Sequence, residues 1–402
     1  MPIAKGVSKQ VGYKKESTWG TLAGPSSGKL LRRVTASFNL VKEAYESGEI
    51  RTDRQVSDFR HGVRSAEGTI NGELSPATYA DFMASIVARD FTTAPTAASL
   101  SVTIAASGLL YTVTRATGSW LTDGFTVGMV VRLTGAGLNA ANSAKNLLVA
   151  SVSALVLSVI PINESVLVAE GPIASVTATA TGKVTSVPAT AHTDDSFTVE
   201  EFYADIAQSE VYTGMKVNSM SVQLPASGLT TVDFGFAGKD LTQTGTSQYF
   251  TSPTAQNTNG IFAAVNGVML VAGQPIALIT SADFSVERAT ENAISVGSNS
   301  VSEIFTGRIR VTGNMSVYFQ DAAFRSYFDE ETPVSIVLAV TADSGSASGF
   351  VTFTLPKVKL GSFTKDDGEL GVVASTSFQA LLNDVTTAGL PATTIQIQDS
   401  AV

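Results

Sequence analysis

The 402-residue chain contains no cysteine, only two histidines and two tryptophans, and few charged residues, which make up 15% of it. Without cysteine the protein has no disulfide framework and no thiolate chemistry, which is compatible with folding in a reducing cytosol. Low charge combined with many Gly, Ser, Thr, Ala and Val residues is typical of short strands joined by tight turns. The sequence therefore predicts a mainly β protein.

Basic residues are also in deficit. The chain has 26 Lys and Arg against 35 Asp and Glu, which gives a formal net charge of −9 at pH 7. A protein that binds DNA regardless of sequence needs a basic surface to neutralise phosphates. The charge balance therefore argues against such a DNA binder, although it leaves open DNA that merely passes by.

Long hydrophobic runs are missing as well. The run closest to a membrane segment, residues 147–162, is interrupted by Ser151, Ser153 and Pro161 and is short for a bilayer span. We interpret it as buried strands and expect no membrane partner. The N-terminal residues 1–17 include lysines but no apolar core, so we expect no secretory signal.

One pattern occurs twice, once near each end: an alternating strand, a polar loop, a second strand with a glycine, and a short amphipathic helix. The first copy contains Phe38, Leu40 and Lys42, then Ile70, Gly72 and Leu74; the second contains Phe284, Val286 and Arg288, then Val311, Gly313 and Met315. The leading Phe and the Gly are 34 residues apart in one copy and 29 in the other. A duplicated hairpin indicates a ring-forming building block, because two similar units in one subunit can alternate around a closed barrel.

Each hairpin is followed by a predicted helix. Ser75 as N-cap with Pro76 at the first helical position begins one helix, and Asp321 as N-cap begins the other. Their apolar faces consist of Tyr79, Phe82, Met83, Ile86 and Val87 in the first, and Phe324, Tyr327 and Phe328 in the second. Further strands are predicted at residues 216–224, 230–238, 334–341 and 350–360. We expect these strands to form a second sheet, giving a sandwich with the helices at its flanks.

The composition changes after residue 90. Residues 91–192 contain only seven charged side chains in 102, with Ala, Thr, Ser and Val dominating. This stretch predicts a small β-barrel or sandwich inserted into the main fold. The expected domains are residues 1–94, the first part of the main domain; 95–190, the insert; and 191–402, the second part with a C-terminal arm.

Strand alternation divides the duplicated hairpins into two faces. If the apolar positions named above face the core, the opposite face is small, polar and mildly acidic. It carries Ser37, Asn39, Thr69, Asn71, Glu73, Ser285, Glu287, Thr312, Asn314 and Ser316. An ordinary solvent-exposed sheet face is one interpretation. The lining of a wide aqueous channel is the other.

The loop within the first hairpin is the most charged stretch of the chain. Residues 42–67 carry eleven charges of both signs. The candidate contact residues are Glu49, Arg51, Asp53, Arg54, Asp58, Arg60 and Arg64. This stretch is either a solvated loop or an arm that contacts a neighbouring subunit, because paired charges fix register and partner choice more than affinity.

Candidate catalytic and metal sites find little support. Residues 24–30 resemble a phosphate-binding loop but are one residue short, with Leu30 where Ser or Thr must meet magnesium. His192 with Asp194 and Asp195 lacks the further ligands of a stable zinc site. We therefore predict no catalytic residue, no cofactor and no metal.

A series of motifs on these segments resembles the major tail tube proteins of long, non-contractile-tailed bacteriophages. It consists of YKKESTWGT at 13–21, GEIRTDR at 48–54, GTINGELSP at 68–76, FTVEEFY at 197–203, GMKVNSM at 214–220 and FAGKD at 236–240. The likeness covers roughly residues 10–90 and 195–380 and omits the insert.

The resemblance implies a non-enzymatic structural protein of the virion tail, assembled in the host cytoplasm. In this family each subunit gives two β-hairpins to a ring, six subunits close a 24-stranded inner barrel, and rings stack into a tube that conducts the genome. The polar face is then lumenal, the charged loop reaches a neighbouring subunit or ring, and the insert lies on the exterior. The implied partners are further copies of the chain, the tail terminator, distal tail and tape measure proteins, and genomic DNA that passes without specific binding.

Two other functions remain open from the residues. One is a virion surface or decoration protein whose insert is a carbohydrate-binding β module. The other is a glycan-degrading enzyme, which needs paired carboxylates beside a sugar-sized cleft. The sequence places no such pair.

Overall fold

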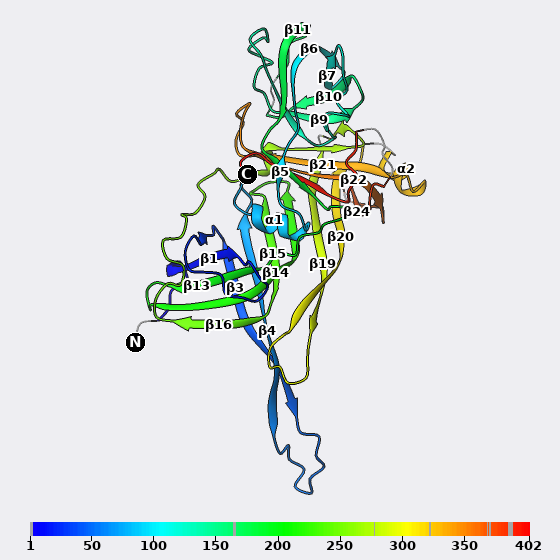
Figure 1. Cartoon of the computed structure of the whole chain (residues 1–402). Coiled ribbons are helices and arrows are strands. Elements are labelled where there is room, and N and C mark those ends of the chain that lie inside the picture. The colour runs from blue at the N-terminus through cyan, green and yellow to red at the C-terminus, as the bar shows by residue number, and fades with distance from the viewer. Residues whose placement is uncertain are drawn as a thin grey trace.

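A computed structural model describes residues 3–163, 166–276, 278–320, 323–367, 369, 371–384 and 389–402. The predicted mainly β class is confirmed: antiparallel strands dominate, and the helices are α1 (Ala80–Ile86) and α2 (Ala323–Asp329), with short 3-10 turns at Gly6–Ser8 and Ala264–Asn266. In Figure 1 a small barrel lies at one end of the molecule and a long hairpin projects from the other.

Eight strands form one continuous antiparallel layer, which we call the inner sheet. In order across the sheet these are β3 (Thr35–Glu46), β4 (Phe59–Glu73), β15 (Thr231–Gly238), β14 (Gln208–Pro225), β19 (Ile279–Ala293), β20 (Glu303–Tyr318), β24 (Val373–Ala380) and β22 (Phe350–Leu360). The two duplicated hairpins, β3–β4 and β19–β20, are therefore separated by β15 and β14. The two-residue strand β23 (Thr364–Lys365) continues the edge after β22 and also pairs with β24.

Two outer sheets branch from the inner sheet because β14 and β22 are long enough to belong to both layers. The first consists of β2 (Lys29–Leu30), β1 (Lys9–Lys15), β13 (Phe197–Tyr203), the first half of β14 and β16 (Asp240–Gly245). The second consists of β18 (Gln274–Pro275), β17 (Gly267–Val271), β21 (Val334–Thr341), the first half of β22, β25 (Gln396–Asp399), β12 (Lys183–Ser186) and β5 (Thr92–Thr93).

The prediction of a separate second sheet was thus wrong for residues 216–224 and 230–238. They form the second half of β14 and the whole of β15, and both lie in the inner sheet. The strands predicted at 334–341 and 350–360 do contribute to an outer sheet, as β21 and β22. Strand order depends on pairing partners far away in the chain, which local alternation does not encode.

The insert folds as a closed six-stranded barrel. Its strands are β6 (Thr96–Ser107), β7 (Leu110–Arg115), β8 (Val130–Thr134), β9 (Leu147–Val152), β10 (Val156–Pro161) and β11 (Glu170–Ala180). The apolar run 147–162 becomes β9 and β10, as predicted. The following strand β12 leaves the barrel and pairs with β25 and β5 in the second outer sheet. We expected a C-terminal arm, but β25 is instead buried between β12 and β22.

The layers stack in a defined order. The hydrophobic core between the inner sheet and the outer sheets is called the main core below. On the second outer sheet Ile336 and Leu338 pack into this main core, whereas Val337 and Ala339 pack into the core of the barrel. Phe284 of the inner sheet reaches Phe353 of β22 across the main core, with ring centroids 5.0 Å apart. The order is therefore inner sheet, main core, second outer sheet and barrel. The barrel and the face of the inner sheet that points away from the main core thus lie on opposite sides of the molecule.

Helix α1 begins later than the sequence predicts. Ser75 and Pro76 lie in a turn, the helix starts at Ala80, and the Ser75 hydroxyl contacts Thr78 at 2.6 Å instead of capping the helix. The reason is Ala77, whose φ of 61° is left-handed and whose N–H donates to the buried Asp399 carboxylate at 2.7 Å. The predicted N-cap of α2, Asp321, lies outside the described residues. Phe324, Tyr327 and Phe328 of α2 pack against the main core as expected.

Candidate functional surface: a polar sheet face and two hairpins

The ten residues predicted for the polar face all lie on the inner sheet, and none is buried. Their apolar neighbours in the pattern, such as Phe38, Ile70, Phe284 and Met315, are at most 3% exposed, so the two faces separate as alternation requires. Cross-strand hydrogen bonds order the polar face. The Asn71 amide donates to Asp233 at 2.6 Å, the Asn314 amide donates to Asp283 at 3.1 Å, and Ser316 contacts Ser375 at 2.9 Å.

The polar face is larger than the sequence interpretation made it. It continues over β14 and β15, which lie between the two hairpins, and over β24, which lies beside the second hairpin. The residues concerned are Ser219, Ser221, Gln223, Thr231, Asp233, Ser375, Ser377 and Gln379. Alternation in these strands was visible in the sequence. The sequence prediction left β14 and β15 out of the polar face because it assigned residues 216–224 and 230–238 to a second sheet.

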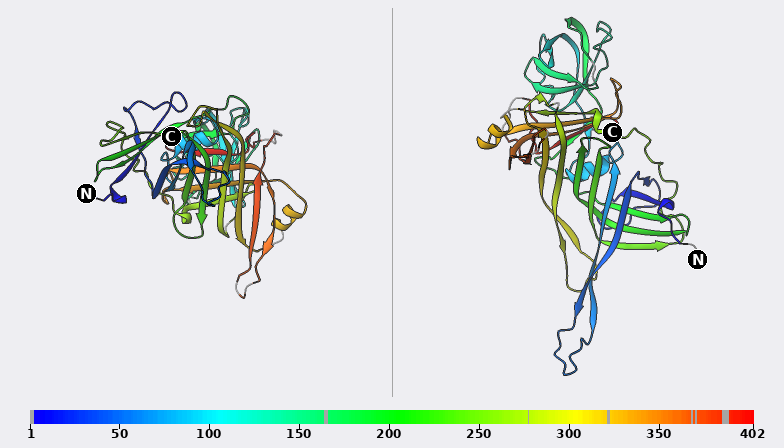
Figure 2. Two further views of the ribbon diagram at one scale, coloured as in Figure 1. Left: turned by 90° about the horizontal axis from the view of Figure 1, so that it is seen from below. Right: turned by 180° about the vertical axis from the view of Figure 1, so that it is seen from behind.

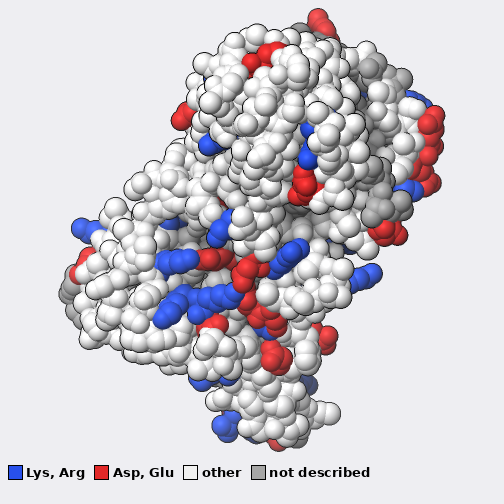
Figure 3. Space-filling model, turned by 45° about the horizontal axis from the view of Figure 1, so that its top comes forward, with Lys and Arg blue, Asp and Glu red and all other residues white. Residues whose placement is uncertain are grey.

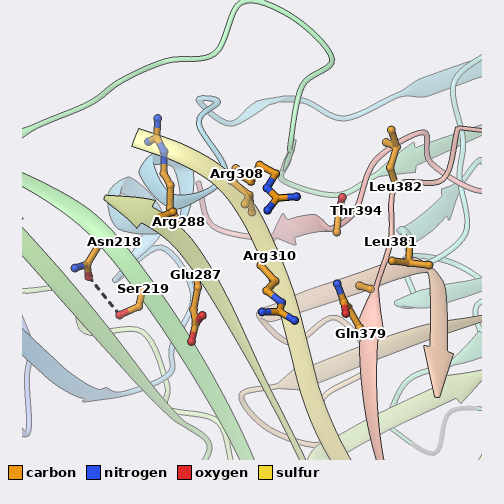
Figure 4. Close-up of a pocket in the computed structure, with 13 residues that line it drawn as sticks. Asn218, Ser219, Glu287, Arg288, Arg308, Arg310, Gln379, Leu381, Leu382 and Thr394 are labelled. Carbon is orange, nitrogen blue, oxygen red and sulfur yellow. Dashed lines mark hydrogen bonds between the residues drawn. The ribbon is translucent and has the colours of Figure 1, made fainter. Parts of the chain in front are cut away.

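Charge on the polar face is mixed. Figure 4 shows Glu287, Arg310 and Gln379 directed to one side of β19, β20 and β24, and Arg288 directed to the other. Glu287 lies opposite Arg310 in the strand register. An open hollow of about 950 Å³ lies at this position. Glu287 partly cancels the charge of Arg310, but Arg308 also lines the hollow, so the mild acidity of the polar face does not extend to this position.

The β3–β4 hairpin extends far beyond the rest of the sheet, as Figure 1 and the right view of Figure 2 show. The predicted contact residues Glu49, Arg51, Asp53, Arg54, Asp58 and Arg60 are exposed on it. Two ion pairs organise the hairpin locally: Arg51 with Asp53 at 2.9 Å and Arg60 with Asp58 at 3.0 Å. The hairpin also carries the exposed apolar side chains Tyr45, Ile50, Val56 and Phe59.

Arg64 differs from the other residues of the predicted contact set. It lies within β4, two thirds buried, and its guanidinium pairs with Asp240 of β16 at 2.7 Å. Its backbone N–H donates to Asn299 in the loop of the second hairpin, and its carbonyl accepts from Val301. Arg64 therefore holds the two hairpins of one chain together instead of projecting from the loop.

An ionic cluster of two buried cations and two half-exposed carboxylates lies where β14 meets β19. The ammonium of Lys216, 1% exposed, contacts Asp194 at 2.6 Å and Glu303 at 3.1 Å, and Arg288 contacts Asp194 at 3.2 Å. Burial lowers the pKa of the Arg288 guanidinium, and the carboxylate of Asp194 opposes that shift. We call these four residues the seam cluster. In the sequence, Asp194 was a candidate only for a metal ligand, beside His192 and Asp195.

The candidate sites rejected from the sequence have structural explanations. Asp194 belongs to the seam cluster and Asp195 pairs with Lys15 at 2.7 Å. Gly28 has no room for a side chain because the Phe250 ring covers it. Among the described residues no group of three or more His, Cys, Asp and Glu side chains is placed to hold a metal ion.

Surface composition separates the barrel from the remaining protein. Figure 3 shows charged side chains gathered below the barrel and only scattered ones on it. In the part of the chain that the structure describes, no helix is long and apolar enough to cross a membrane.

A family model described as phage tail tube protein matches residues 6–380. The chain belongs to the phage tail tube protein family. The family match spans both hairpins and also the barrel between them, so it covers nearly all of the polar face. It supports the resemblance that the sequence motifs indicated and identifies the protein as a structural component of the phage tail. No curated protein matches the chain.

Proposed function

We propose that this tail tube protein forms closed rings that stack into a hollow tube, and that the polar face of the inner sheet lines the lumen through which the genome passes. The family resemblance implies an inner barrel of 24 strands. Six units of four strands close such a barrel, however many chains supply them, and the eight-stranded inner sheet contains two such units. The layer order is the observation that carries this proposal. The polar face is the one surface of the inner sheet that neither the main core nor the barrel covers.

The chemistry of the polar face suits a conduit for DNA. Hydroxyl and amide groups bonded across strands leave few free donors for phosphates, and the acidic residues Glu73, Asp233, Asp283 and Glu287 oppose adhesion. A lumen that bound DNA tightly would hinder its exit. Closing the sheet into a barrel also removes its exposed strand edges.

The β3–β4 hairpin is suited to join consecutive rings. Ile50 is fully exposed and Val56 is 66% exposed, which is costly for a tip that stays in water. At the opposite end of the inner sheet an apolar groove of about 450 Å³ is lined by Leu278, Phe324 and Tyr327, among others. We propose that the tip from one ring docks into this groove of the next, with the loop charges setting register.

The proposed partners follow from this arrangement. Further copies of the chain stack on both sides, tail terminator and distal tail proteins bind the two ends, and the tape measure protein and then genomic DNA occupy the lumen. Assembly takes place in the host cytoplasm, and the barrel decorates the exterior. No step requires catalysis.

Electron microscopy of the purified protein or of particles tests the proposal. A hollow tube with six-fold arranged inner units is expected, and globular monomers under every assembly condition would contradict it. Changing Glu73 and Glu287 to Lys should leave folding and tube yield unchanged while lowering infectivity. Full infectivity of assembled particles would show that these residues are not lumenal or that lumen charge is unimportant.

Stacking has its own test. Ile50→Asp with Val56→Asp, and charge reversal of Arg51 with Arg54, should reduce tube length and yield. Val166→Asp, which changes an exposed valine near the barrel, is the matched control and should assemble normally. Normal tubes from the hairpin variants would contradict the docking contact.

A further inference from the structure

The duplication extends beyond the hairpins to two complete units. In the first unit β1 pairs with β13, β13 with the first half of β14, and the second half of β14 with β15, which pairs with β4. In the second unit β17, β21, β22, β24 and β20 repeat these pairings in the same order. Helices α1 and α2 occupy equivalent places in the chain order. Each unit therefore gives four strands to the inner sheet.

Residue pairing fixes the correspondence between the units. Four residues lie side by side across the four inner strands of each unit. In the first unit they are Phe38, Gly68, Phe236 and Val217, and in the second they are Phe284, Gly313, Phe378 and Leu360. Gly313 thus corresponds to Gly68, not to Gly72 as the sequence pattern indicated. The Phe-to-Gly spacing becomes 30 and 29 residues. Both hairpins also change register at the equivalent point, after Lys42 in one and after Arg288 in the other.

The seam between the two units shows how such units join. β14 of the first unit pairs with β19 of the second over seven residue pairs, from Ser219 opposite Glu287 to Pro225 opposite Ser281. The seam cluster lies beside this pairing. Asp194 of the first unit bridges Lys216 of its own unit and Arg288 of the next unit.

The outer edges of the chain repeat the two sides of this seam. β22 continued by β23 corresponds to the second half of β14, and no other described strand pairs with its outer edge. β3 corresponds to β19, and among the described residues it pairs only with β4. Lys359 is then equivalent to Lys216, and Lys42 to Arg288. Glu331, which lies three residues before β21 as Asp194 lies three before β13, already pairs with Lys359 at 2.9 Å.

We infer that three copies of this chain, not six, close each ring, with β3 of one copy joining the β22–β23 edge of its neighbour as β19 joins β14. This inference rests on the proposed tube function. Eight inner strands per chain give 24 strands in three copies. At each junction between chains, Glu331 bridges Lys359 and the neighbour's Lys42, completing the counterpart of the seam cluster.

The β3 edge is partly capped in the single chain. Glu201 accepts from the Phe38 N–H at 3.1 Å, Tyr212 donates to the Phe38 carbonyl at 2.9 Å, and Lys9 donates to the Ala36 carbonyl at 2.9 Å. No such cap contacts the backbone of Leu40 or Lys42 among the described residues. By the correspondence with the seam, pairing with a neighbour covers residues 35–41 of β3. It therefore starts beside Leu40 and displaces the caps as it extends to Phe38.

Symmetry and mass of the assembled protein test the inference. Cryo-electron microscopy of tubes should show three barrels around each ring, and native mass spectrometry of rings should give three times the 41.7-kDa chain mass. Six barrels around each ring, with a ring mass six times that of the chain, would overturn the three-chain ring and leave the tube function intact. Failure to form any ring or tube would instead contradict the proposed function and the inference with it.

Charge exchange tests the junction itself. Lys42→Glu alone and Glu331→Lys alone should each lower ring formation about five-fold per junction, and the double variant should restore it. Glu330→Lys makes the same charge change one residue away and should have no effect. Absence of rescue in the double variant, with folded protein by circular dichroism, would contradict this junction.

Discussion

The two units of the chain share one strand arrangement but differ in what covers the equivalent positions. In the first unit Lys216 is buried in the seam cluster, whereas its counterpart Lys359 in the second unit is 42% exposed. The first unit carries the long charged hairpin, and the second supports the barrel, although the barrel is inserted in the first unit's part of the chain. In the tube that we propose, the shared arrangement builds the wall, and the differences reflect which neighbour each unit faces.

The largest expected effect tests whether the equivalent glycines serve both units alike. A Cβ at Gly68 would lie 2.1 Å from the Phe38 ring, and one at Gly313 would lie 2.3 Å from the Asp283 carbonyl oxygen and 2.4 Å from the Phe378 ring, so both positions are closed to a side chain although the covering rings are not equivalent. Gly68→Ala and Gly313→Ala should each lower the free energy of unfolding by about 1–3 kcal/mol, because overpacking displaces a core aromatic. Urea denaturation measures this. Gly48→Ala, with open space around its Cβ position, is the control, and a large difference between the two core variants would weaken the equivalence.

The seam cluster should separate the two units most clearly. Asp194→Asn leaves the buried Lys216 and Arg288 with less compensating charge and should cost about 2 kcal/mol. Its counterpart Glu331→Gln in the unassembled chain should cost nothing measurable, since that pair is exposed. Chemical denaturation of the monomer compares the two variants. Equal losses would show that burial of the seam is not what distinguishes the units.

Asp399 links the end of the second unit to the approach of α1 in the first. Burial raises the pKa of its carboxyl to about 6, although N–H groups of Ala77 and Ala401 donate to it. Because the folded-state pKa is above the unfolded one, stability should fall by roughly 1–2 kcal/mol as the pH rises from about 4 through 6. Melting temperatures across this range measure it. Asp399→Asn should flatten that part of the profile, and an unchanged profile would exclude Asp399 as its source.

The smallest effect concerns the contact between the two hairpins. Arg64→Ala removes the ion pair with Asp240, whose side chain is only 13% exposed, and should cost about 1 kcal/mol. Arg60→Ala removes an exposed pair on the same strand and should cost nothing measurable. Thermal denaturation distinguishes them. An equal response would mean that Arg64 contributes no more than a surface charge.

The sequence predicted those features that depend on neighbouring residues. Alternation assigned Asn39 and Thr69 to one face and Phe38 and Ile70 to the other, because side-chain direction in a strand is a local property. Helix α1 was placed too early because Asp399, more than 300 residues away, holds Ala77 in a left-handed conformation.

Features set by distant partners were not predictable in this way. The passage of β14 and β22 from one sheet to another depends on which strands flank them, and the pairing of Arg64 with Asp240 depends on the position of β16. The seam cluster combines residues from four separate segments. Its charges carry no sequence spacing that marks them as one group.

The side-chain caps on β3 bear on how tube growth starts. In the assembly that we propose, a free chain must give up two bonds before it gains those of a neighbouring strand: the one that Glu201 accepts from the Phe38 N–H and the one that Tyr212 donates to the Phe38 carbonyl. That exchange places an activation barrier before the first closed ring, so free subunits stay dispersed at concentrations where a finished tube is stable. A preformed ring that already presents its hairpin tips lowers the barrier for the next layer. We therefore expect elongation from a template to outpace spontaneous initiation, so that the number of tubes follows the number of templates.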